Sequence, residues 1–181
     1  MNSPLDRLLP ELDRIEPRAR AAVAALPDTK FHQAPVEGGW SVAEIFEHLC
    51  IATDSYVGGP IPAAIEKARA DAKGPGRPWR PSFMGGMLTR ALEETSVRKL
   101  PTPKVLRVGA VRANVVEHFL AGIRRLREQL VAADGLDLGT GLASPVSALI
   151  RVNLGDAFAI NVAHAHRHLG QVERTRRALG V

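Results

Sequence analysis

Apolar residues recur at helical spacing in four long stretches of this chain, separated by segments rich in glycine and proline. The first stretch predicts a helix over about 4–26, in which Pro10 and Pro17 favour a kink or a split into two pieces. The second begins at Ser41, because Ser41 and Glu44 have the spacing of a capping box. Its inward face is expected to carry Ile45, Phe46, Leu49, Ala52 and Tyr56.

Two further helices follow a long and irregular segment. The third is predicted over 111–133, and the fourth begins at Asn153 and Asp156 and runs to about Leu179, just before Gly180. Segment 58–108 is interrupted by proline and glycine and predicts a crossover with two short helices, near 63–73 and 85–95. Segment 135–147 is a glycine-rich connection, and no strand is expected. The pattern therefore predicts an all-α protein, a four-helix bundle with one long crossover.

The amino-acid composition is consistent with an all-α fold and limits the binding partners to be expected. The 181 residues fit one domain, 1–181, with 45% hydrophobic and only 4% aromatic residues. The net charge of +5 comes from arginines that alternate with acidic residues, as on solvated helix faces, so we do not expect nucleic acid as a partner. A single cysteine, Cys50, excludes an internal disulfide. Without an apolar run of membrane length or a signal sequence, we expect a soluble, cytoplasmic protein.

The fourth helix carries three of the six histidines within five positions. His164 and His168 stand at i and i+4 on the face of its apolar stripe, whereas His166 points almost to the opposite side. Two imidazoles in this arrangement can share a metal ion. Asn161 and Gln171 extend the same face and are candidates to orient the imidazoles or to contact a substrate. The alternative is a solvated histidine tract near the negative end of the helix dipole.

Two ligands hold a metal weakly, so a third is expected elsewhere in the chain. His48 lies beside Leu49 on the inward face of the second helix and is the candidate. Catalytic metal sites typically have three protein ligands and keep an open position for water. The set His48, His164 and His168 has this number. A His-Glu-x-x-His metalloprotease motif is excluded, because Ala165 occupies the place of its glutamate. Protonation of the imidazoles should weaken metal binding below about pH 6.5.

The crossover offers one further set of candidates. Trp79 is flanked by Arg77 and Arg80, a combination that suits an anionic substrate at the rim of a pocket. The alternative is that Trp79 only pins the crossover to the bundle.

Two motifs resemble those of the DinB-like (DinB/YfiT) superfamily. One is Gly39-Trp40-Ser41-Val42-Ala43-Glu44-Ile45 running into His48-Leu49, and the other is His164-x3-His168-Leu169-Gly170-Gln171. The resemblance covers nearly the whole chain and implies an up-down-down-up four-helix bundle, often dimeric. It also implies a divalent metal such as Zn or Ni on the three matching histidines, His48, His164 and His168.

Members of this superfamily include metal-dependent hydrolases and thiol transferases that use bacillithiol or mycothiol. The resemblance therefore implies a homodimer that acts on a small molecule through its metal, alone or together with a low-molecular-weight thiol. The metal could activate a bound water or present a thiolate to an electrophile. The alternative is a non-enzymatic structural or stress-linked binding module whose metal site is vestigial or absent.

Overall fold

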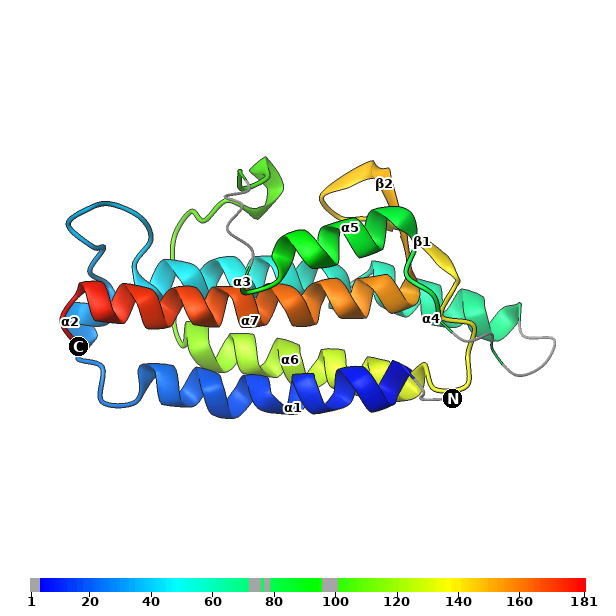
Figure 1. Ribbon diagram of the computed structural model, residues 1–181, viewed down its shortest axis with the longest axis horizontal. Coiled ribbons are helices and arrows are strands. Elements are labelled where there is room, and N and C mark those ends of the chain that lie inside the picture. Colours follow the sequence, from blue (N-terminus) through cyan, green and yellow to red (C-terminus); the bar gives the residue numbers. More distant parts are fainter. Residues whose placement is uncertain (1–3, 72–75, 77–78, 96–100) are drawn as a thin grey trace.

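Four long helices pack side by side as a bundle (Figure 1). The computed structural model describes residues 4–71, 76, 79–95 and 101–181. The long helices are α1 (Pro4–Val23), α3 (Val42–Val57), α6 (Val115–Ala132) and α7 (Leu154–Ala178). Helices α1 and α7 run in one direction and α3 and α6 in the other, so the up-down-down-up order is confirmed. The fold is all-α apart from one small hairpin, as predicted.

The core lies between these helices, because each buries the stripe that its periodicity predicts. Helix α1 packs on α6 and α7, and α3 packs on the same two helices. The arginine-rich faces carry ion pairs between helices, such as Arg127–Asp13 at 2.7 Å and Arg18–Glu173 at 2.8 Å. Pairs this exposed contribute at most about 1 kcal/mol each, so apolar burial stabilises the bundle. Fully buried side chains in the core include Phe46, Phe119, Phe158, Leu12, Ile15, Ile45 and Leu49.

Helix α1 is continuous through both of its prolines. Pro10 and Pro17 are exposed, so the carbonyl groups that they leave without an amide partner can be hydrated. The helix ends at Val23, three residues before the predicted end, because Ala25 adopts a left-handed conformation with φ 57°. The predicted loop that follows contains a single helical turn, α2 (Asp28–Phe31).

Helix α3 begins at the predicted capping box, with the Ser41 amide 2.8 Å from Glu44 Oε2 and the Glu44 amide 3.2 Å from Ser41 Oγ. Helix α6 begins at Val115, four residues later than predicted. The preceding segment is bound to α3 instead, since the backbone and guanidinium of Arg112 both donate to the buried carboxylate of Glu47. The periodicity could not reveal this tertiary contact.

The expectation of no strands is wrong at one place. Strands β1 (Gly141–Ser144) and β2 (Ser147–Asn153) form an antiparallel hairpin with a bulge between Ala143 and Ser144. Leu142 and Val152 are partners in the register and are both buried. The hairpin packs on α4, α5 and α7, so it is stabilised by tertiary contacts. The sequence of a short glycine-containing segment does not predict such contacts.

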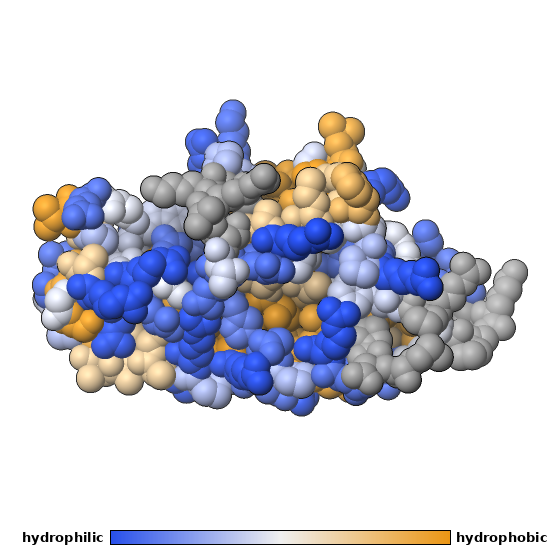
Figure 2. All heavy atoms as spheres, viewed as in Figure 1, coloured by the Kyte–Doolittle hydropathy of each residue, from blue (hydrophilic) through white to orange (hydrophobic). Residues whose placement is uncertain are grey.

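The crossover carries the two expected short helices, shifted by two or three residues. They are α4 (Pro60–Ala70) and α5 (Phe83–Leu92), followed by the 3₁₀ turn η1 (Lys104–Leu106); residues 72 and 73 of the first prediction lie outside the described part. Phe83, Met87 and Leu149 are exposed, and Figure 2 shows hydrophobic side chains gathered over α5 and the hairpin. None of the described helices is both long enough and apolar enough to cross a membrane.

The start of α7 is fixed to the crossover by one side chain. Asn153 Oδ1 accepts from the Asp156 amide at 2.8 Å and from Trp79 Nε1 at 3.0 Å, and its Nδ2 donates to the Arg80 carbonyl at 3.0 Å. A Cβ at Gly155 would lie only 2.4 Å from the indole, so glycine is required for this approach. Trp79 therefore pins the crossover to the bundle.

Replacing Asn153 with alanine should lower the free energy of unfolding by about 2–3 kcal/mol, because the variant loses a helix cap and leaves the indole N–H without its acceptor. Ser82→Ala is the matched control, since Ser82 caps α5 through one hydrogen bond to the Gly85 amide and should cost only about 1 kcal/mol. Urea unfolding of the two variants measures the difference. Equal losses would contradict the role of Asn153.

Candidate metal centre

The bundle brings His48, His164 and His168 together, although His48 is more than a hundred residues from the other two. Antiparallel packing of α3 and α7 places the inward face of one helix against that of the other. His48 Nε2 lies 3.1 Å from His164 Nε2, and one nitrogen from each of the three rings lies within 4.8 Å of the others. The His164 and His168 ring centroids are 4.5 Å apart, as their i, i+4 spacing predicts.

Two of the rings are held by their far nitrogens. His48 Nδ1 lies 2.9 Å from the Leu106 carbonyl oxygen in η1, and His168 Nδ1 lies 2.8 Å from Gln171 Oε1. Carbonyl oxygens only accept, so each Nδ1 carries the proton and each Nε2 of the neutral ring presents a lone pair. The arrangement is the one in which outer partners orient metal-binding histidines.

Burial keeps all three rings neutral. Desolvation lowers the pKa of His48, and it lowers that of His164 well below the usual range, with the charges of His168 and His48 adding to the effect. The pKa of His168 falls to about 3, first because of desolvation and then because of His48, while Gln171 opposes the shift. Neutral imidazoles do not need to lose a proton before they bind a cation. The three histidines could therefore hold a metal ion.

The rings lie in the wall of a cavity of about 590 Å³ between α3, α5, α7 and the hairpin. Trp40 covers the site, with its ring 4.8 Å from His48 and 6.2 Å from His168. Asn161 also lines the cavity, but its amide nitrogen donates to the Ala157 carbonyl of its own helix at 2.8 Å. The described lining residues include no carboxylate, so a general base of that kind is not present among them.

The sequence analysis missed several lining residues. Tyr56 and Ser144 meet in the cavity, where Tyr56 Oη and Ser144 Oγ are 3.1 Å apart. Arg167 lines the cavity between His164 and His168, and Arg174 lies beyond them along α7. Arg174 follows Gln171 by three positions on α7, so helical spacing was a usable signal for it. For Ser144 there was none, because its place depends on the hairpin that the pattern did not predict.

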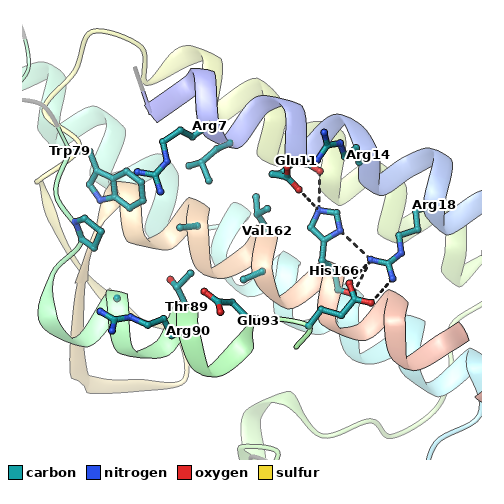
Figure 3. A pocket seen from close by; sticks show the side chains of 16 residues that line it. Arg7, Glu11, Arg14, Arg18, Trp79, Thr89, Arg90, Glu93, Val162 and His166 are labelled. Atoms are coloured by element: carbon teal, nitrogen blue, oxygen red, sulfur yellow. Dashed lines mark hydrogen bonds and ion pairs between the residues drawn. The ribbon is translucent and has the colours of Figure 1, made fainter. Parts of the chain in front are cut away.

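The crossover candidates lie elsewhere. Trp79 lines a second groove, of about 670 Å³, on the other side of α7, with the Arg7 guanidinium 5.7 Å from its ring (Figure 3). Arg80 is exposed and is not among the residues lining the histidine cavity, and Arg77 lies outside the described residues. The structure therefore does not bring Trp79 or Arg80 to the three histidines.

Other candidate groups have structural partners. His166 points away from the site, as predicted, and its Nε2 lies 3.1 Å from the Glu11 carbonyl oxygen in α1 (Figure 3). Cys50 is buried and its thiol donates to the Val115 carbonyl at 3.3 Å. Burial raises the pKa of this thiol to about 12, so it stays protonated and is no nucleophile.

Comparison with known protein families assigns the chain to one of them. The family model of the DinB superfamily matches residues 11–172. The chain belongs to the DinB superfamily. The match includes both histidine motifs, the whole of α3 and α6 and most of α1 and α7, which agrees with the resemblance seen in the sequence. Neither a curated protein nor a solved structure matches the chain.

Proposed function

We propose that this DinB superfamily protein is a metal-dependent enzyme that acts on a small molecule, with His48, His164 and His168 as ligands of one divalent ion, Zn or Ni. The observation that carries the proposal is the convergence of three neutral imidazoles in the wall of a large cavity. We further propose that the protein works in the cytoplasm as a homodimer.

The donor set fits such an ion. Nitrogens that share one zinc ion at about 2.0–2.1 Å lie about 3.3 Å from one another in a tetrahedral site, and His48 Nε2 and His164 Nε2 are 3.1 Å apart. His168 has its Nδ1 bound to Gln171, which leaves Nε2 for the ion. Three protein ligands leave a coordination position for a substrate, as in catalytic zinc sites.

The residues around the site suit either of two reactions, transfer of a low-molecular-weight thiol to an electrophile or hydrolysis. A divalent ion would lower the pKa of a bound thiol or water and so supply the nucleophile. The chain itself would orient the imidazoles through Leu106 and Gln171 and exclude water with Trp40. The described lining residues offer no carboxylate base, so in either reaction the nucleophile would be formed by the ion itself, through the lowered pKa of the bound thiol or water.

Metal-loaded protein should convert activated esters or alkylating electrophiles, and turnover of the electrophiles should require an added thiol. His168→Ala is expected to reduce turnover by at least about 100-fold, since it removes a ligand. His166→Ala, on the other face of α7, should retain activity. Turnover that survives His168→Ala would show that the site is not the catalyst.

A protein that binds no metal and turns over no substrate would instead support the alternative, a structural or stress-linked binding module. In that case replacing all three histidines with alanine should leave the thermal stability unchanged, and added metal should not raise the melting temperature of the parent protein.

A further inference from the structure

The cavity at the three histidines has two chemically different ends. The stripe of α3 that faces it runs from His48 through Ala52 to Tyr56, and the stripe of α7 runs from Ile160 through the histidines to Arg174. Eight residues of helix span about 12 Å and six span about 9 Å. The histidines therefore lie between the two ends, with room for part of a ligand on either side.

One end is an apolar chamber. Its walls are Leu88 of α5, Val146 and Ile150 of the hairpin, Ala52 of α3 and Ile160 of α7. Its two hydroxyl groups, on Tyr56 and Ser144, are buried and lie 3.1 Å apart, so they are hydrogen-bonded to each other. An apolar group of a ligand binds favourably in this chamber because its surface is removed from water. A charged group would be unfavourable there, because it would lose its hydration without gaining a partner.

The other end is cationic. Arg174 is exposed at the cavity, and no ion pair joins it to a carboxylate in the described part of the chain. The nearby carboxylate of Glu94 is bound by Arg18, with Nη2 and Oε1 2.7 Å apart. The Arg167 guanidinium, also at the cavity, donates to the Glu93 carbonyl at 3.0 Å. An anionic group suits this end, because a guanidinium binds carboxylates with paired hydrogen bonds.

We propose that the ligand of this cavity is an amphipathic organic anion, with an unbranched apolar chain in the chamber and a carboxylate at Arg174. The group between them then lies over the three histidines. The proposal rests on the proposed function for where the reaction takes place, but binding of the ligand does not require the metal.

Titration calorimetry of the full chain, metal-free and zinc-loaded, tests the proposal with butanoate, hexanoate, octanoate and the alcohols of the same lengths. Each methylene that enters the chamber should tighten binding about fourfold. Ala52→Leu narrows the chamber, so the affinity should stop rising at a shorter ligand chain. Ile160→Ala widens it, so the affinity should keep rising up to a longer ligand chain. The two variants change the chamber in opposite directions, so a misfolded one leaves the other as a test.

Arg174→Gln should weaken carboxylate binding by about twofold to fivefold and leave the alcohols unchanged. Arg177→Gln is the matched control, an exposed arginine on the same helix that does not line the cavity. Equal effects of the two replacements, or affinity independent of chain length, would overturn the proposal. If the affinity depends on the length of the ligand chain but the protein binds no zinc, the proposed metal-dependent function is wrong and the ligand proposal still holds.

Discussion

His164→Ala is expected to lose its divalent metal, whereas His166→Ala keeps it. Removal of an outer partner typically costs about 10–100-fold in metal affinity, so loss of a ligand should cost at least about 100-fold. His166 lies on the same helix but contacts Glu11 in α1 and not the other histidines. Elemental analysis of untagged protein, with zinc titration against a chelator, measures the effect.

Gln171→Leu extends the same series. The variant keeps all three imidazoles but removes the acceptor of His168 Nδ1, so its zinc affinity should fall by about 10–100-fold. The expected order is therefore parent and His166→Ala, then Gln171→Leu, then His164→Ala. Equal metal content in parent and His164→Ala would refute the proposed ligand set.

Metal-free protein is expected to lose stability as the pH falls from 7 to 5. The folded-state pKa of His168 is lowered to about 3, whereas an unfolded histidine titrates near 6.5. In this window the unfolded chain binds a proton that the folded chain does not, so the free energy of unfolding falls with pH. His168 alone should account for about 2 kcal/mol, and the lowered pKa values of His48 and His164 add to the loss.

Urea unfolding of chelator-treated protein at several pH values measures this loss. His168→Gln provides the control, because it replaces the titrating ring with a neutral amide and should flatten the pH dependence by about the amount assigned to His168. Most carboxylates titrate below this window. An unchanged pH dependence in His168→Gln would mean that folding does not lower the pKa of this ring.

The four long helices, and the starts of α3 and α7, could be read from the sequence because periodicity and capping depend on neighbours in the chain. The capping boxes at Ser41 and Asn153 fix two helix starts to the residue. Local signals failed where a tertiary contact decided the outcome: Glu47 binds Arg112 before α6, and the hairpin exists because Leu142 and Val152 are buried together.

In the candidate site, too, some features follow from local spacing and others from tertiary packing. Spacing alone placed His164 and His168 on one face of α7, and the inward lean of His48 with the family resemblance supplied the third ring. Only the packing of α3 on α7 brought the rings within reach of one ion. The same packing placed Trp79 in a different groove, away from the three histidines.

The sequence by itself thus determined the four long helices and the caps of α3 and α7, since periodicity and capping act over a few residues. It identified the three histidines as one set only together with the family resemblance. The tertiary structure decided which atoms hold the rings and what shape of cavity they face. Leu106 holds His48 across 58 positions and Tyr56 meets Ser144 across 88. Contacts at such separations follow from how the helices and the hairpin pack, and no local pattern encodes them.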